Sequence, residues 1–267
     1  MIARGSVGGR PRRVLGIPPA VVAAIAVAWA LALAAQATGR GRLLGHDELI
    51  HSGLSLWAAL GLHLLAWQVM VAAMMLPSSL PLVRLFATVS SNHRRAGVAM
   101  SAFLTGYAVV WSVFGALAFL GDALTHDTVD ATPWLAAHPA VIGGGVLALA
   151  GAFQFSSLKY RCLKECRHPA GFLLPRYQRG TRAAFRLGRQ HGLFCLGCCW
   201  AMMLLLFVGG VVMNLVWVAL IAGFVLVEKL APFGPVTGRI AGAFLAVFRP
   251  ERRAVSQVTG HEPKSDN

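Results

Sequence analysis

The feature that most constrains this sequence is a series of apolar runs, several of them close to 20 residues long and almost free of charge. A helix needs about 20 apolar residues to cross the roughly 30 Å hydrocarbon core of a bilayer. These runs predict spanning helices near residues 17–37, 54–76, 98–120 and 139–157. In the whole chain 57% of residues are hydrophobic and 13% are charged, too apolar for an ordinary soluble domain. We therefore expect an all-α fold, a polytopic transmembrane helical bundle.

The last apolar block begins at Leu193 and continues for about 35 residues, which as one helix would overshoot any bilayer at about 1.5 Å per residue. Gly209 and Gly210 interrupt it. We therefore expect two shorter helices, near 193–209 and 212–229, joined in a tight hairpin. This division brings the predicted number of spanning helices to about six.

The two ends of the chain flank a predicted transmembrane domain over residues 17–249. Residues 1–16 form a basic tail, and residues 250–267 are polar and without periodic pattern, so we expect them to be disordered. Residues 235–248 are too few to span easily. They are expected to lie in the membrane interface or to form a partial seventh helix.

Positive charge is confined to alternate connections between the apolar runs. Of the 24 Lys and Arg residues, 22 fall in the N-terminal tail and in segments 78–97, 158–192 and 229–267, whereas the other connections hold only Arg40 and Arg42. Basic residues in short loops stay on the cytoplasmic side. The pattern predicts a multi-pass protein of the bacterial inner (plasma) membrane with both termini cytoplasmic. A net charge of +14 placed in this way favours the lipid bilayer as partner and argues against nucleic acid.

Three of the five cysteines cluster at the predicted start of the fifth helix. Cys195, Cys198 and Cys199 have the spacing i, i+3 and i+4, so their sulfurs share one helix face, and His191 lies one turn earlier. Helix starts favour thiolates, the form that binds metals. If this face is in the reducing cytosol, stable disulfides are disfavoured, which leaves metal binding, redox chemistry or packing.

The other two cysteines lie in the connection that precedes this helix. Cys162 and Cys166 are separated by three residues and followed by His168. This spacing can hold a metal on a helical turn, although zinc sites more often have two intervening residues. Because the fourth and fifth helices would meet this connection at one face of the membrane, both cysteine groups are expected to lie close together.

Methionines form a third group at the predicted cytoplasmic end of the second helix. Met70 and Met74 are four residues apart, Met75 is adjacent, and Pro77 is expected to mark the helix end. Thioethers near thiolates favour Cu(I). The rival interpretation is that cysteine and methionine simply fill space in the core. The convergence of three groups, rather than any one spacing, favours metal binding.

Three segments together resemble a bacterial domain-of-unknown-function family that is described as predicted metal-binding integral membrane proteins. They are Met70–Ser78 (MVAAMMLPS), Gly151–Leu163 (GAFQFSSLKYRCL) and Gly192–Met203 (GLFCLGCCWAMM). The resemblance covers roughly residues 50–230. It implies a helical membrane protein whose matching Cys and Met residues are candidate metal ligands.

The leading hypothesis is a membrane protein that binds a soft transition metal, copper first and zinc second, through Cys and Met at the cytoplasmic ends of helices. Its role would be metal transfer, transport or assembly of a metalloprotein, with a metallochaperone or a metalloprotein client as partner. Two alternatives stay open: a membrane thiol-disulfide or quinone-linked redox protein, and a structural subunit of a membrane complex. No catalytic motif is evident beyond the Cys-x2-Cys-Cys segment, so whether the protein is an enzyme stays undecided.

Overall fold

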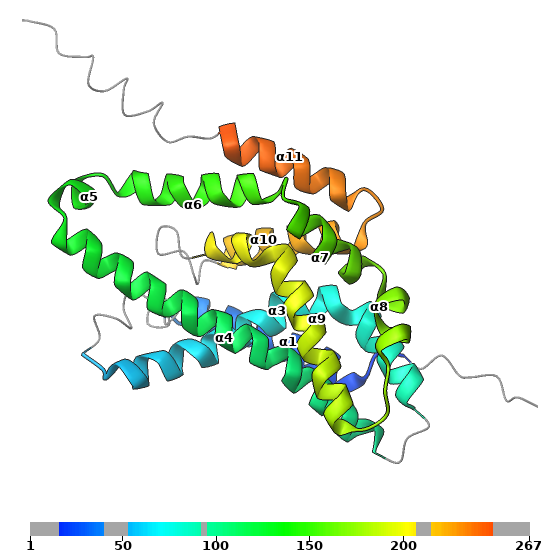
Figure 1. Cartoon of the computed structure of the whole chain (residues 1–267). Coiled ribbons are helices and arrows are strands. Elements are labelled where there is room, and N and C mark those ends of the chain that lie inside the picture. The colour runs from blue at the N-terminus through cyan, green and yellow to red at the C-terminus, as the bar shows by residue number, and fades with distance from the viewer. Residues whose placement is uncertain (1–15, 40–52, 92–94, 207–214, 248–267) are drawn as a thin grey trace, which may run out of the picture.

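The computed structural model describes residues 16–39, 53–91, 95–206 and 215–247, and in these residues the regular structure is entirely helical. The helices, shown in Figure 1, are α1 (Pro19–Ala37), α3 (Leu56–Ser90), α4 (Ala96–Ala131), α5 (Pro133–Ala137), α6 (Pro139–Phe153), α7 (Ser157–Arg167), α8 (Pro169–Arg176), α9 (Thr181–Leu204), α10 (Leu215–Leu230) and α11 (Gly234–Val247). The all-α prediction is therefore confirmed. The predictions for the basic tail up to residue 15, for the break at Gly209 and Gly210 and for the tail 250–267 lie outside the described residues.

The predicted number of six spanning helices is not reached in the described part of the chain. Only α1, α3 and α4 are long and apolar enough to cross a membrane, and a fourth is added if α6 and α7, bent by 63°, count as one broken span. The first half of α9 carries Arg182, Arg186 and Arg189, and α10 has only 16 residues. By itself, α9 is therefore too polar to count as a membrane-spanning helix, and α10 is too short.

Helix α3 does not end at Pro77, as the sequence predicted, but continues to Ser90. A proline inside a helix has no N–H for the carbonyl four residues earlier, here that of Ala73. The indole Nε1 of Trp29 on α1 donates to this carbonyl oxygen over 3.1 Å. A neighbouring helix therefore satisfies the freed group, which is how prolines are accommodated within membrane helices.

Three other helix boundaries also differ from the prediction. Helix α4 extends to Ala131 rather than ending near residue 120, and α9 begins at Thr181 rather than near residue 193. Helix α6 ends at Phe153, four residues early, and Ser156 then begins α7 by accepting a hydrogen bond from the Lys159 amide at 3.1 Å. Side-chain capping of this kind starts a helix in a polar segment. The predicted connection 158–192 is consequently mostly helical.

Helices α4 and α9 lie side by side and pack against each other along much of their length (Figure 1). Gly188 on α9 lies against the backbone carbonyl of Phe103, and Gly106 on α4 lies against that of Phe185. Small residues allow membrane helices to approach in this way. The close approach fixes α9, which carries three cysteines, relative to α4.

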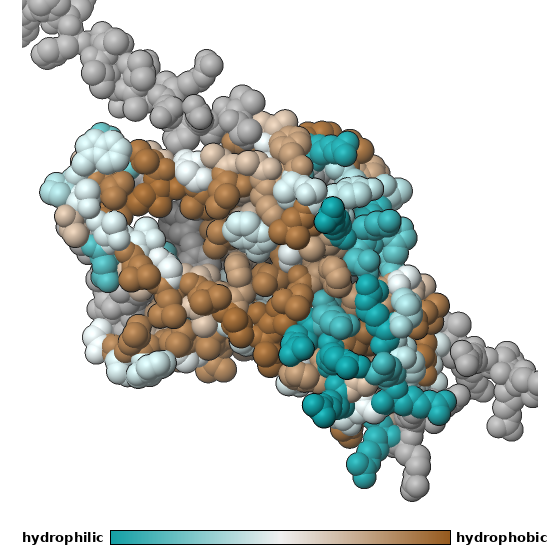
Figure 2. Space-filling model, in the orientation of Figure 1, coloured by the Kyte–Doolittle hydropathy of each residue, from teal (hydrophilic) through white to brown (hydrophobic). Residues whose placement is uncertain are grey.

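Helix α11 lies alongside α6, and it also packs against α10 (Figure 1). Its 14 residues would extend about 21 Å, less than a bilayer core. Figure 2 shows hydrophilic side chains gathered along the side of the molecule where α7, α8 and the start of α9 lie, and hydrophobic ones over α4 and α6. On the face shown, the surface is thus divided into an apolar part and a hydrophilic part, and the latter is basic because segment 157–189 holds nine Lys and Arg residues and one Glu.

Candidate metal centre

Most of the sulfur-containing side chains meet in one buried cluster between α3, α7 and α9, called here the sulfur cluster. Its sulfur-bearing members are Met70, Met74, Met75, Cys162, Cys195, Cys198, Cys199, Met202 and Met203, with the half-buried Cys166 packed against them. None of the nine is more than 7% exposed. The structure thus brings together the three groups that are far apart in the sequence.

A close approach between two sulfur atoms joins α9 to α3. Cys199 Sγ lies 3.7 Å from Met75 Sδ, and both side chains are at most 1% exposed. Two sulfurs that bind one ion at about 2.3 Å each can be up to about 4.6 Å apart. The pair is therefore within the distance at which both atoms could hold the same ion.

The cysteine side chains of α9 are oriented by their own helix. The thiols of Cys198 and Cys199 donate to the carbonyl oxygen of Cys195 at 3.0 and 2.9 Å. Hydrogen bonds from a side chain to the preceding turn are common for small polar residues in helices. They hold both sulfurs beside Cys195, so the three thiols occupy one stretch of the helix surface.

Cys195 is surrounded by polar groups that the sequence analysis did not identify. Lys229 Nζ on α10 donates to Cys195 Sγ at 3.0 Å and to Ser78 Oγ at 3.2 Å, and Tyr107 Oη lies 3.1 Å from the same sulfur. Lys229 is only 4% exposed. A buried ammonium needs a compensating anionic partner, and a Cys195 thiolate would provide one.

Helix α7 contributes the second cysteine pair from the other side of α9. Cys162 lies against Gly197, where an added Cβ would come within 2.5 Å of its Sγ. Cys166, one turn later, remains half-buried and packs against the sulfur cluster. Glycine at position 197 therefore allows α7 to bring its cysteines next to those of α9.

The two candidate histidines are placed differently from the sulfur atoms. His191 is buried, its Nε2 lies 3.1 Å from Ser79 Oγ, and its ring stacks on Tyr107 at 5.6 Å. It borders the sulfur cluster. His168 is exposed at the end of α7, where its Nδ1 lies 2.8 Å from the carbonyl oxygen of Lys164. His168 thus lies outside the cluster.

The candidate ligands of α3 and α9 do not lie at the helix ends where the sequence predicted them, which corrects the prediction. Met70, Met74 and Met75 lie near the middle of α3, and Cys195 is in the second half of α9. The first-turn N–H groups of α9 are therefore too distant to stabilise these thiolates, because the dipole effect is limited to the first turn. The nearby positive charge comes from Lys229 instead.

A second buried polar group lies next to the cysteines. Lys159 Nζ is 2.8 Å from Glu228 Oε2 and donates to the carbonyl oxygen of Cys198 at 3.2 Å. Arg167 donates to the backbone carbonyl of Glu228. Ionisable residues at the edge of an apolar run are a signal of function. Glu228 and Lys229, which end the last apolar block, carry that signal, although Lys229 taken as a loop charge alone gives no hint of a site.

The donor set limits which metal the cluster could hold. In the described ranges, no group of three or more His, Cys, Asp and Glu side chains is arranged to hold a metal ion. Zinc usually takes four such ligands. The close pair instead combines a thiol with a thioether, a set that suits Cu(I). The residues present therefore fit copper better than zinc.

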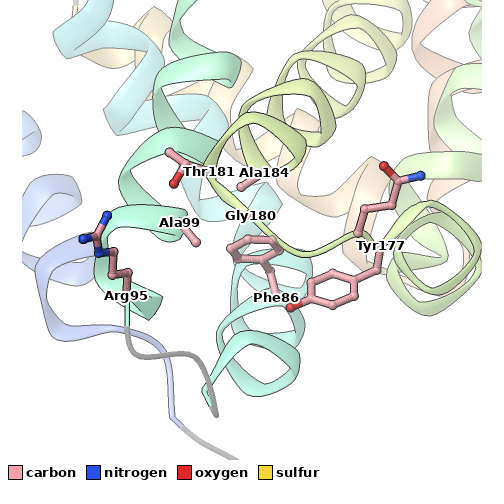
Figure 3. Close-up of a pocket in the computed structure, with 8 residues that line it drawn as sticks. Phe86, Arg95, Ala99, Tyr177, Gly180, Thr181 and Ala184 are labelled. Carbon is pink, nitrogen blue, oxygen red and sulfur yellow. The ribbon is translucent and has the colours of Figure 1, made fainter.

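A hollow of about 550 Å³ lies away from the sulfur cluster, between α3, α4, α8 and the start of α9. Figure 3 shows Phe86, Tyr177 and Arg95 around it, and no cysteine or methionine lines it. Phe86 and Tyr177 meet edge to face at 6.1 Å between ring centroids. With no sulfur ligand on its walls, this hollow is not a soft-metal site.

Fold and site together define a helical protein in which apolar, membrane-length helices surround a buried set of thiols and thioethers. The sequence profile of the PpoB2 family, described as a copper chaperone, matches residues 64–249. The chain belongs to this family. The matched region includes all five cysteines and the three methionines of α3. No curated protein and no solved structure matches the chain.

Proposed function

We propose that this protein is a copper chaperone of the bacterial inner membrane that holds Cu(I) in the sulfur cluster and passes it to a metalloprotein client. The observation that carries the proposal is the 3.7 Å approach of Cys199 Sγ to Met75 Sδ inside a buried cluster of thiols. Membership of a family described as a copper chaperone supports the same cargo. The metal is cargo here, bound and released unchanged.

The buried charges support Cu(I) in particular. Lys159 and Glu228 form an ion pair and compensate each other, so Lys229 is left with one positive charge beside the cysteines. A site made of the Cys195 and Cys199 thiolates, the neutral thioether of Met75 and one Cu(I) ion would carry one negative charge, which Lys229 would balance. Thioether ligands add to the preference for Cu(I) over harder ions. Buried charges that are compensated in this way avoid a large desolvation cost.

The membrane location is proposed from surface and charge. Large apolar side chains face outward on the candidate spans, among them Leu31 at 52% exposed, Leu117 at 64% and Leu124 at 65%. Exposed apolar surface on this scale fits contact with lipid. The basic side formed by α7, α8 and the start of α9 would face the cytoplasm (Figure 2). The charge pattern of the sequence favours both chain termini on the same side of the membrane.

The first test is a metal titration of the full-length protein, purified in detergent under reducing conditions. We expect about one equivalent of Cu(I) to be taken from a colorimetric Cu(I) chelator, and an excess of Zn²⁺ not to displace it, because thioether ligands discriminate against zinc. Failure to withdraw copper from the chelator, or displacement by zinc, would contradict the proposal.

A second candidate function is thiol-disulfide exchange, and the surroundings of Cys195 favour it. Lys229 and Tyr107 both contact this sulfur, and such partners support a reactive thiolate. A redox role requires that a mixed disulfide with a client be trapped when a neighbouring cysteine is replaced. The copper proposal requires that the metal-loaded protein resist alkylation at Cys195.

A further inference from the structure

A cleft of about 540 Å³ lies on the far side of Lys159 from the cysteines, where the α6–α7 bend meets the end of α10 and the start of α11. Its lining includes Gln154, Lys159, Leu163, Glu228, Gly238 and Arg239. A volume of this size is typical of small-molecule sites. No step of the copper binding described above uses this cleft.

Two buried polar side chains border the cleft with hydrogen-bonding atoms unused. Glu228 is 1% exposed and Gln154 is 6% exposed. Within the described part of the chain, Glu228 Oε1 and both polar side-chain atoms of Gln154 have no hydrogen-bond partner. Buried polar atoms are normally paired, and each exception calls for an explanation such as a ligand.

The unused oxygens face the same space. A Cβ added to Gly238 would contact Glu228 Oε1 and would lie 3.6 Å from Gln154 Oε1. Only glycine fits at position 238, because Glu228 Oε1 lies directly against the backbone of α11 there. Two neighbouring acceptor oxygens without a described partner, on residues that line the cleft, suit a hydrogen-bond donor such as an ammonium group.

The charges around the cleft define the rest of the ligand. Lys159 and Arg239 are cationic and Glu228 is anionic, so the lining has one net positive charge. A bare metal cation would therefore be disfavoured. The lining fits a small zwitterion with an excess of carboxylates, its ammonium group at Glu228 Oε1 and its carboxylates at Arg239 and the Gln154 amide.

The cleft is connected to the sulfur cluster through the same ion pair. Lys159 Nζ bonds both Glu228 Oε2 and the carbonyl oxygen of Cys198. Leu163, which lines the cleft, directly follows Cys162. A ligand in the cleft therefore lies one layer of side chains from the thiols.

We propose that this cleft binds a small zwitterionic thiol, of the class that carries Cu(I) as a thiolate complex in reducing compartments, and that it is the loading site of the sulfur cluster. Binding of the thiol to the cleft does not require copper, whereas the role of the cleft in loading copper rests on the proposed function. In loading, the bond from copper to the carrier sulfur breaks and a bond to a cluster cysteine forms. The proton of that cysteine passes to the released carrier thiolate, and copper remains Cu(I).

The test measures binding of reduced glutathione and of S-methylglutathione to the metal-free, full-length protein by calorimetry. Both should bind, because the cleft recognises the ammonium and carboxylate groups. Gln154→Leu and Arg239→Gln should each weaken binding at least tenfold. Gln154 has no described hydrogen bond to lose and Arg239 is exposed, so both variants should fold. Arg182→Gln, the same charge change on exposed α9 surface, is the control and should bind as the parent protein does.

Absence of saturable glutathione binding, or equal binding by the parent protein and both cleft variants, would overturn the inference. The outcome separates it from the proposed function. A protein that takes up Cu(I) but not glutathione keeps its copper role and loses the loading site. A protein that binds glutathione in the cleft but takes up no Cu(I) keeps the ligand site and loses the copper role.

Discussion

Replacing Cys195, Cys198 and Cys199 together by Ser is expected to lower the bound copper from about one equivalent to background. Serine hydroxyls are hard ligands that do not hold Cu(I), and the thioether of Met75 would then lack the thiol at 3.7 Å. Serine in a helix can make the same hydrogen bond to the preceding turn, and its hydroxyl can accept from Lys229 in place of the Cys195 sulfur. Size-exclusion chromatography and a melting curve check that the variant keeps the fold. Copper is measured by elemental analysis after Cu(I) loading and desalting.

The control for this variant is Met100→Leu, which removes a sulfur from a different core cluster, the one around Phe86 and Phe103. That change conserves volume and should cost little stability. Its copper content should equal that of the parent protein. Equal copper in the triple serine variant and in Met100→Leu would remove the cysteines of α9 from the site.

Gly188→Leu is expected to abolish folding. Among single substitutions, this is the largest loss of stability that we expect. A Cβ at position 188 would overlap the backbone carbonyl of Phe103, and a backbone cannot move aside as a side chain can. Overpacking a core with flexible neighbours already costs about 1–3 kcal/mol. Against a backbone the cost should approach the total stability, which is commonly about 5–15 kcal/mol. The yield of monodisperse protein in size-exclusion chromatography should fall to near zero.

Gly121→Leu provides the comparison, because Gly121 is exposed on α4 and an added Cβ there meets nothing within 4 Å. Replacing a helical glycine at an open position removes its entropic cost and should leave stability unchanged or slightly higher. A Gly188→Leu protein that elutes and melts like Gly121→Leu would mean that α4 and α9 do not pack as described.

The helical class of the fold could be predicted from apolar runs alone, but helix ends could not. At Pro77 the local signal is a helix stop. The indole of Trp29, which lies 44 residues before Ala73 in the chain, changes the outcome by donating to the freed Ala73 carbonyl. The start of α9 was missed because its first half is basic and does not follow the apolar pattern. Tertiary contacts determine where α3 ends and where α9 begins. A local sequence pattern carries no information about these contacts.

Part of the candidate site could likewise be predicted from the sequence, and part could not. The meeting of Cys162, Cys199 and Met75 could be expected, because the predicted topology places their segments at one face of the membrane, and the structure has them in one buried cluster. The contacts of Lys229 and Tyr107 with Cys195 could not, since they depend on the rotation of α10 and α4 about their axes. A charged residue at the end of an apolar run can extend into solvent or turn inward, and only packing decides between these.

The central claim, a buried Cu(I) site made of sulfur ligands, is tested most directly by X-ray absorption at the copper edge of the loaded protein. We expect the edge of Cu(I) and only sulfur neighbours, at about 2.3 Å, the usual length of a metal–thiolate bond. A first shell of nitrogen or oxygen neighbours, or a Cu(II) edge in the reduced sample, would contradict the account.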